Sequence, residues 1–360
     1  MLIQNYNSSA LIAKVCFDDE TTSDNFHLLR FSEEKCYIHT DTIKSYDFIK
    51  SENEKLNSGD TVLIYQNGYV RKLFDCTSYS QTIITTNRCS SNCIMCPYTS
   101  NQRKHSENQN IDLLLEQIDY LPNDTAHLVV TGGEPTLIGF DFFRFMSKIK
   151  THFPDIVCLL LTNGRTFANH NTVRLAKETF PVMTQIAIPI HSADADLHDE
   201  ITQGKDSFNQ TANAVARLLA ENFFIEIRIV VSGLNINSMD GIAELIINRF
   251  PKVSLVNFMG VEMCGNASIN SNIVWTDYNT AFRKCETAIE KLIKFGIDVG
   301  IYNFPLCSVP VRFHGIYKKS ISEYKVRYSE KCKNCIKKEL CGGFFASSLK
   351  YAQDSVIPYI

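Results

Sequence analysis

The chain has 360 residues, of which 44% are hydrophobic and 21% charged, so it can bury a large core within one large domain and smaller appendages. The formal net charge of −3 argues against a globally basic nucleic-acid-binding protein. No apolar run approaches the roughly 18 residues of a membrane span, and the first residues lack the apolar core of a signal peptide, so we expect a cytoplasmic protein without a membrane segment.

Residues 1–78 show short apolar runs separated by polar, turn-rich segments. The runs at 10–17 and 61–65 are typical of strands, and the Asn67-Gly68 pair is typical of a turn. This pattern predicts a small β-rich N-terminal module over residues 1–78.

From residue 79 the pattern changes to alternating strands and helices. Strand-like runs lie at 81–86, 127–131, 156–162, 185–190, 224–231 and 253–258. Helical spacing of apolar residues recurs between them, and Ser238 is placed to N-cap one of these helices. Strands that alternate with crossover helices imply an α/β fold, and six such units predict a partial (β/α)6 TIM barrel over residues 79–295. Its active site is expected at the carboxyl ends of the strands.

Three cysteines follow the first barrel strand within eight residues: Cys89, Cys93 and Cys96. Thirteen cysteines in a chain without a predicted export signal favour metal ligation over disulfides. Three thiolates at this spacing can hold a [4Fe-4S] cluster and leave its fourth iron open to another ligand.

This C-x3-C-x2-C loop resembles the signature of the radical S-adenosylmethionine (SAM) superfamily. The resemblance implies that SAM binds the open iron and is reductively cleaved to a 5′-deoxyadenosyl radical. The superfamily also binds the amino group of SAM with a Gly-Gly-Glu-Pro segment after the second strand. Here that segment is Gly132-Gly133-Glu134-Pro135, and its paired glycines permit a close backbone approach. The superfamily usually has an aromatic residue where this chain has Met95.

Three further polar residues lie at or near strand ends. Asn163 suits ribose or substrate hydroxyls, with a plain Asn-Gly turn as the alternative. Ser192 lies in a segment that resembles the ribose contact of many superfamily members. Arg228 is placed to clamp the SAM carboxylate, with pairing to Glu226 as an equal alternative.

A second cysteine group lies in the final segment, residues 296–360, which begins with a short predicted strand at 299–302. Cys307, Cys332, Cys335 and Cys341 supply four thiolates, which suit a closed [4Fe-4S] cluster or a zinc site. The spacing resembles the auxiliary-cluster extensions called SPASM and twitch domains. Phe345 stands where the longer SPASM form continues with cysteine, so the resemblance implies a single auxiliary cluster.

Residues 312–338 carry nine Lys or Arg residues against two Glu residues. Charge balance beside an anionic cluster, an acidic leader peptide and RNA are three accounts of this basic segment.

Several segments together resemble the radical SAM maturases of His-Xaa-Ser systems, the HxsC family. They lie at 85–97, 188–194, 258–260, 301–307 and 341–345. The resemblance implies an oxidoreductase-type peptide maturase (a RiPP maturase) that modifies or crosslinks a ribosomally made peptide with His-Xaa-Ser repeats. It also implies a second radical SAM protein as a possible partner and an electron donor such as flavodoxin or ferredoxin. The alternatives are a radical SAM enzyme acting on a small molecule or tRNA, and a zinc-stabilised binding module without enzymatic activity.

Overall fold

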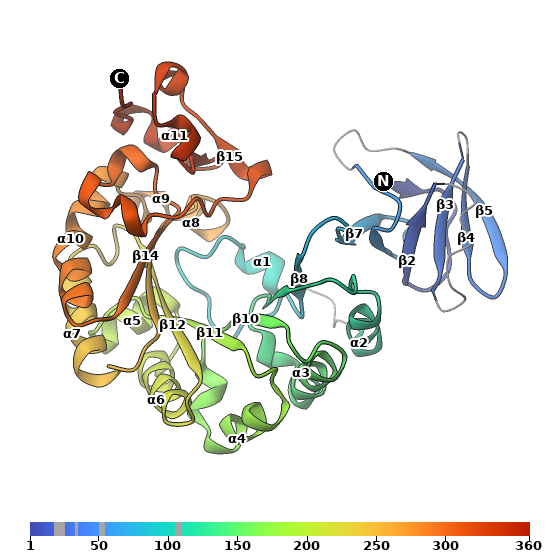
Figure 1. Cartoon of the computed structure of the whole chain (residues 1–360), viewed down its shortest axis with the longest axis horizontal. Helices are drawn as coiled ribbons and strands as arrows, with labels where there is room; N and C mark the ends of the chain where they lie inside the picture. Colours follow the sequence, from blue (N-terminus) through green and yellow to red (C-terminus); the bar gives the residue numbers. More distant parts are fainter. Residues whose placement is uncertain (18–25, 33–34, 50–54, 105–109) are drawn as a thin grey trace. The chain divides into compact units, whose positions relative to one another are not determined.

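A computed structural model of the chain describes residues 1–17, 26–32, 35–49, 55–104 and 110–360 (Figure 1). Its residues form two compact units. The first contains Met1–Thr86, Glu107–Leu160 and Glu178–Thr184, and the second contains Asn87–Ser106, Leu161–Lys177 and Gln185–Ile360.

The N-terminal part of the first unit is a β-rich module, as predicted. Its strands are β1 (Leu2–Ile3), β2 (Leu11–Cys16), β3 (Leu28–Phe31), β4 (Lys35–His39), β5 (Ile43–Ile49), β6 (Thr61–Ile64) and β7 (Val70–Phe74). They form one sheet in the order β1-β5-β4-β3-β2-β6-β7. The sheet closes on itself, because Ile3 N–H donates to Gly68 O at 2.8 Å and Val70 N–H donates to Met1 O at 3.0 Å. Alternate strand residues such as Val15, Leu29 and Val62 fill its core.

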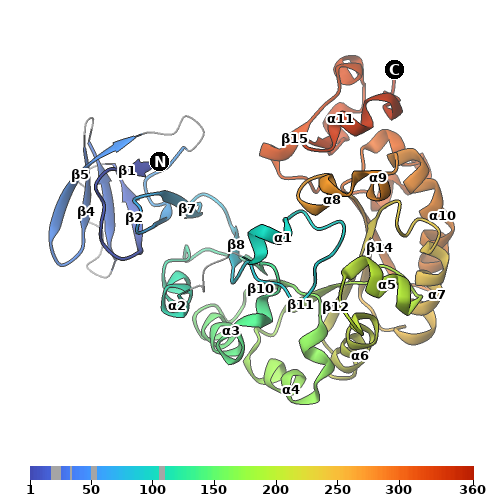
Figure 2. The same ribbon diagram turned by 180° about the vertical axis from the view of Figure 1, so that it is seen from behind.

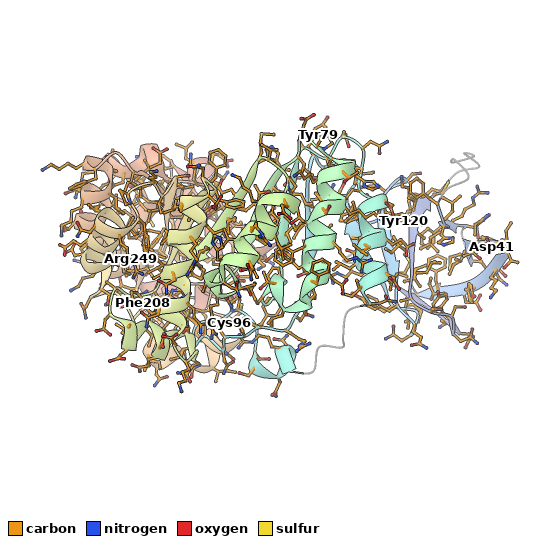
Figure 3. All side chains as sticks on the ribbon, turned by 90° about the horizontal axis from the view of Figure 1, so that it is seen from below. Asp41, Tyr79, Cys96, Tyr120, Phe208 and Arg249 are labelled. Carbon is orange, nitrogen blue, oxygen red and sulfur yellow. The ribbon has the colours of Figure 1, made fainter. Side chains whose placement is uncertain are left out.

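The first unit also contains three parallel strands and two helices. The strands are β8 (Ser80–Ile84), β9 (His127–Thr131) and β10 (Val157–Leu161), and the helices are α2 (Ile111–Asp119) and α3 (Phe140–His152). Tyr120, at the end of α2, contacts the β-rich module (Figure 3). Its hydroxyl accepts a hydrogen bond from His27 N–H at 3.1 Å, and its carbonyl accepts one from Thr61 Oγ1 at 3.0 Å. These buried bonds tie the module to the helix.

The second unit continues the alternation of strands and helices. Its parallel strands are β11 (Thr184–Pro189), β12 (Phe224–Val231), β13 (Leu255–Gly260) and β14 (Asp298–Tyr302). Its longer helices are α4 (His170–Thr179), α5 (Ala195–Thr202), α6 (Ser207–Ala220), α7 (Met239–Arg249) and α10 (Tyr278–Lys294), several of which are clear from behind in Figure 2. On β12, Ile225, Ile227 and Ile229 are fully buried, whereas Glu226 and Arg228 alternate with them on the opposite face. This alternation gives the sheet one apolar face and one face with polar groups.

Strands β8 to β14 follow one another in sequence order within a single seven-stranded sheet. The α/β fold and the partial TIM barrel are therefore confirmed. The seventh strand, β14, is the short strand predicted at 299–302, which had been assigned to the final segment; it pairs with β13 and so extends the barrel sheet. Ser238 occupies the N-cap position of α7, as predicted. Its side chain makes no capping hydrogen bond, so it does not stabilise the helix in the predicted way.

The remaining elements are short. They are α1 (Ser100–Lys104), α8 (Asn266–Ile269), α9 (Ser271–Val274), β15 (Val326–Arg327), β16 (Phe344–Phe345), α11 (Leu349–Ala352) and 3-10 helices at Pro135–Ile138, Arg165–Ala168, Leu306–Ser308, Val311–Ile316, Glu323–Lys325, Glu330–Asn334, Lys338–Leu340 and Gln353–Ser355. None of the helices in the described residues is long and apolar enough to cross a membrane.

Candidate active site

The loop between β8 and α1 carries Cys89, Cys93 and Cys96, the last of which is labelled in Figure 3. Burial and the neighbouring Cys96 and Cys89 thiols raise the pKa of Cys93 to about 12. The three sulfur atoms therefore share one electrostatic environment, in which a bound cation would stabilise the thiolates. Ser91 N–H also donates to Cys89 Sγ at 3.4 Å. This donor set fits the [4Fe-4S] cluster that the sequence predicts.

Two backbone hydrogen bonds fix the middle of the cysteine loop against the end of α5. Asn92 N–H donates to Thr202 O at 2.9 Å, and Ile94 N–H donates to Ile201 O at 2.9 Å. Met95 is buried in an apolar cluster with Ile201. The loop thus has a defined path, even though it contains no regular secondary structure.

The segment that follows β13 holds the other side of the cysteine loop. Asn266 Nδ2 donates to Cys93 O at 3.1 Å, and Ser100 N–H donates to Asn266 Oδ1 at 3.2 Å. Asn270 Nδ2 donates to Ile94 O at 3.2 Å, and the backbone of residue 267 donates to Cys96 O at 3.3 Å. Asn266 is buried, so water has limited access to its two bonds. We call residues 264–270 the bracket segment.

Two arginines lie along the start of the cysteine loop. Arg165 Nη1 donates to Ser90 O at 3.0 Å, and Arg103 Nη1 donates to Ser91 O at 3.3 Å. The positive charge of Arg103 opposes the rise in the pKa of Cys93. Asn163, predicted as a cofactor contact, donates from Nδ2 to Ser90 Oγ at 2.9 Å. Its amide therefore touches the residue that follows Cys89.

The Gly-Gly-Glu segment turns at the end of β9. Gly132 has a φ of +153°, and a Cβ at this position would lie 2.3 Å from Thr86 O. Gly133 N–H donates to the same carbonyl at 2.8 Å. Glycine is therefore required for this approach to the strand end from which the cysteine loop departs. Glu134 is buried, and its Oε1 accepts from Thr136 N–H at 3.1 Å and Thr136 Oγ1 at 2.7 Å.

The segment after β11 begins with buried polar residues. Ser192 Oγ accepts from Asp194 N–H at 3.0 Å, which forms the turn into α5. Burial lowers the pKa of His191 to about 3 and that of His198 to about 4, so both rings are neutral near pH 7. His191 N–H donates to His198 Nδ1 at 3.3 Å. The contact of Ser192 with ribose stays a prediction.

Arg228 pairs with a carboxylate of the barrel wall, the alternative that the sequence analysis weighed equally. Its Nε lies 2.6 Å from Glu226 Oε1. Glu226 also accepts from Asn257 Nδ2 at 2.6 Å and from Gln185 Nε2 at 2.7 Å. Because Nε is engaged, a SAM carboxylate would have to bind the terminal Nη atoms. That contact also stays a prediction.

The four cysteines of the final segment line one small cavity of about 20 Å³. They are Cys307, Cys332, Cys335 and Cys341. Leu306 N–H and Gly343 N–H each donate to Cys341 Sγ at 3.3 Å. Backbone donors of this kind stabilise a metal-bound thiolate.

The spacing of the sulfur atoms bears on which metal fits. In a tetrahedral zinc site, Zn–S bonds of about 2.3 Å place the sulfur atoms about 3.8 Å apart. Across the part of the chain that the structure describes, only Asp60, Asp75 and Cys76 place three ligand atoms within 4.8 Å of one another. Lys72 already pairs with both carboxylates of that group, with Nζ 2.7 Å from Asp60 and 3.3 Å from Asp75. Both cysteine sets are more widely spaced than a zinc site.

Comparison with known proteins identifies the central part of the chain. Residues 83–246 match the profile of the Radical SAM superfamily. These residues form a radical SAM domain. A domain of this superfamily implies a [4Fe-4S] cluster and SAM as cofactors, and it argues against a purely zinc-stabilised binding module. A search of curated proteins finds no match.

Solved structures with a similar fold include anSMEcpe with bound AdoMet and Cp18Cys peptide, at 16% identity and a TM-score of 0.54 over 78% of this chain and 92% of that one. Streptococcus suis SuiB bound to precursor peptide SuiA is 13% identical, with a TM-score of 0.48 over 62% of this chain. SuiB solved without the peptide is 14% identical, with a TM-score of 0.49 over 73% of this chain. The chain spans 48% and 57% of SuiB in these two structures.

Sequence reasoning missed the residues that hold the cysteine loop: Arg103, Arg165, Asn266 and Asn270. Asn266 lies 173 positions from the carbonyl that it binds, so no local pattern signals the contact. Its place shortly after β13, at the carboxyl end of a barrel strand, was the available signal.

Proposed function

We propose that this enzyme is a peptide maturase, which modifies or crosslinks residues of a ribosomally made peptide with His-Xaa-Ser repeats. The observation that carries the proposal is the second cysteine set, whose four residues line one cavity after the barrel. Its sequence resembles the auxiliary-cluster extensions of radical SAM peptide maturases. The fold is shared with anSMEcpe, which was solved with a bound peptide. The segments that resemble the HxsC family point to the repeat peptide.

The cysteine loop would hold the SAM-binding cluster at Cys89, Cys93 and Cys96. When bound, that cluster supplies the electron that cleaves SAM into methionine and a 5′-deoxyadenosyl radical. The bracket segment and Arg165 keep the loop in place through its carbonyl groups. Gly132, Gly133 and Glu134 would bind the SAM amino group, and Asn163, Ser192 and Arg228 would contact its ribose and carboxylate. An electron donor such as flavodoxin or ferredoxin would supply the electron.

Cys307, Cys332, Cys335 and Cys341 would hold an auxiliary [4Fe-4S] cluster. When bound, it can accept the electron left on the peptide if the product is an oxidative crosslink. The wide sulfur spacing supports a cluster rather than zinc, and the N–H donors on Cys341 would stabilise its thiolate with either metal.

The test is anaerobic reconstitution of the full chain with iron and sulfide, then incubation with SAM, a reductant and a synthetic His-Xaa-Ser repeat peptide. We expect about eight irons per chain, production of 5′-deoxyadenosine and a mass change in the peptide. The matched control replaces Cys89, Cys93 and Cys96 with alanine, which should abolish SAM cleavage. An unmodified peptide despite rapid SAM cleavage would refute peptide maturation and favour a small-molecule or tRNA substrate.

A further inference from the structure

The final segment carries a local excess of positive charge. Residues 318–341 contain eight Lys or Arg residues and three Glu residues, a formal charge of +5 in a chain whose net charge is −3. Among the described residues, only one of these eight cations has an ion pair: Lys325 Nζ lies 3.1 Å from Glu262 Oε1. The rest of the excess is therefore not neutralised by neighbouring carboxylates.

Three of the seven cations without an ion pair are held by neutral groups. Lys319 Nζ donates to Glu339 O at 2.9 Å. Lys337 and Lys338 lie over the rings of Tyr359 and Tyr328, at 4.2 Å and 5.1 Å from the ring centroids. Carbonyl oxygens and aromatic faces orient a cation without removing its charge. These side chains are thus positioned and still available to a partner.

Charge balance with the metal site accounts for only part of this excess. Four thiolates around either a zinc ion or an oxidised [4Fe-4S] cluster leave a net charge of about −2. Set against a formal charge of +5 over residues 318–341, and with Glu262 paired to Lys325, this leaves about two positive charges without a counterpart. The remaining positive charge is the same whether a zinc ion or a [4Fe-4S] cluster binds the four cysteines.

A cavity opens within the same segment. It has a volume of about 410 Å³ and is lined by residues that include Lys319, Ile321, Val326, Tyr328 and Cys341. This volume lies within the range of ligand pockets, about 300–1,000 Å³. The ammonium group of Lys319 and the aliphatic walls complement a side chain with an apolar stem and a carboxylate end. Glu323 also lines the cavity, so the cavity wall carries one negative charge as well as the positive charge of Lys319.

We propose that residues 318–341 form a docking surface for an acidic segment of the peptide substrate, with a glutamate or aspartate side chain entering the cavity beside Cys341. This proposal rests on the proposed function, because it takes the partner to be the substrate peptide. RNA fits the surface less well, since Lys337 and Lys338 cover one face of each tyrosine ring that would otherwise stack on bases. Docking here places the peptide next to the auxiliary cysteine set.

The test is fluorescence anisotropy with the reconstituted full chain, without SAM or reductant. The probes are a short labelled peptide in which Glu alternates with Leu, its counterpart with every Glu replaced by Gln, and labelled oligouridine. We expect the acidic peptide to bind at least about tenfold more tightly than its neutral counterpart, and to be released at about 0.5 M salt. Equal binding of the two peptides, or tighter binding of oligouridine, would overturn the proposal.

A variant with Lys318→Gln and Lys319→Gln removes two exposed charges, one lining the cavity and one beside it in the sequence, without altering a cysteine. It should weaken binding of the acidic peptide about fivefold, as expected for two exposed ion pairs. A matched variant with Lys252→Gln and Lys294→Gln removes two exposed charges elsewhere and should change binding less than about twofold. Equal effects of the two variants would refute the docking surface. Iron content and thermal melting confirm that both variants are folded.

These measurements are independent of the chemistry. A chain that binds the acidic peptide but produces no modified repeat peptide would contradict the proposed function and leave the docking surface standing. A chain that modifies the repeat peptide but shows no preference for acidic sequences would support the proposed function and refute the docking surface.

Discussion

Replacement of Asn266 by alanine tests whether the bracket segment positions the cysteine loop. The change removes three hydrogen bonds: from Nδ2 to Cys93 O at 3.1 Å, from Nδ2 to Asn92 Oδ1 at 3.4 Å, and from Ser100 N–H to Oδ1 at 3.2 Å. At about 1 kcal/mol each, with partners that are partly or fully exposed, the expected loss in unfolding free energy is about 1–3 kcal/mol. That is a substantial part of the 5–15 kcal/mol that is typical of a folded domain.

The assay has two parts. Urea denaturation of the apo chain measures the loss of stability, and anaerobic reconstitution measures the iron retained and the electron paramagnetic resonance spectrum of the reduced cluster. Because one of the lost bonds holds the carbonyl of Cys93 itself, we expect less iron and an altered spectrum. If Asn266 had a purely structural role, the replacement would change only the stability measured by urea denaturation.

Asn235→Ala is the matched control. Asn235 is buried as Asn266 is, and its Nδ2 donates to His191 O and Val230 O, both at 3.1 Å, while its Oδ1 accepts from Ser232 N–H at 3.0 Å. It should lose comparable stability but keep the iron content and spectrum of the unaltered chain. If both variants bind iron equally and give the same spectrum, the reasoning about the bracket segment is wrong.

Three further predictions concern other parts of the chain. Gly132→Ala should lower the unfolding free energy by about 1–3 kcal/mol and weaken SAM binding in calorimetry, because its Cβ would lie 2.3 Å from Thr86 O at a φ of +153°. Cys332→Ala should lower the iron count from about eight to about four while SAM cleavage persists. Burial lowers the pKa of His191 to about 3 and that of His198 to about 4, so the unfolded chain binds protons that the folded chain excludes. Stability should therefore fall by about 2 kcal/mol per histidine between pH 7.5 and 5, measured by urea denaturation.

Each of these predictions has its own control. Gly139→Ala should cost only about 1 kcal/mol, because its φ is +70° but nothing lies within 4 Å of the added Cβ. Cys285→Ala, at a buried lone cysteine, should leave the iron count unchanged. Replacement of His191 and His198 by glutamine should flatten the pH dependence, and an unchanged slope would contradict its assignment to these two residues.

Much of the barrel was predictable because its strands are continuous apolar runs. The runs predicted at 127–131 and 224–231 coincide with β9 and β12. The sequence analysis placed no helix at α10 (Tyr278–Lys294), although its buried residues Phe282, Cys285, Ile289 and Leu292 recur at helical spacing. There the signal was present and was overlooked.

Some features of the candidate site were predictable from the sequence, and others were not. The cysteines and the Gly-Gly-Glu segment are local motifs, which a sequence displays directly. The pairing of Arg228 with Glu226 on the same strand was weighed as an alternative, and it is present, while the contact with the SAM carboxylate stays a prediction. The contacts of Asn266 and Arg165 join distant segments, and only the folded chain brings them together.

The closure of the N-terminal sheet limits how that module can recognise a partner. Many peptide-binding domains take up an extended peptide as an additional strand along an exposed sheet edge. Here β1 pairs with β5 and also bridges to Tyr69, just before β7, so both outer strands of the described sheet have neighbours. A peptide that added a strand to this module would have to pair along the rest of β5, where Ile43–Tyr46 pair with β4 alone among the described strands.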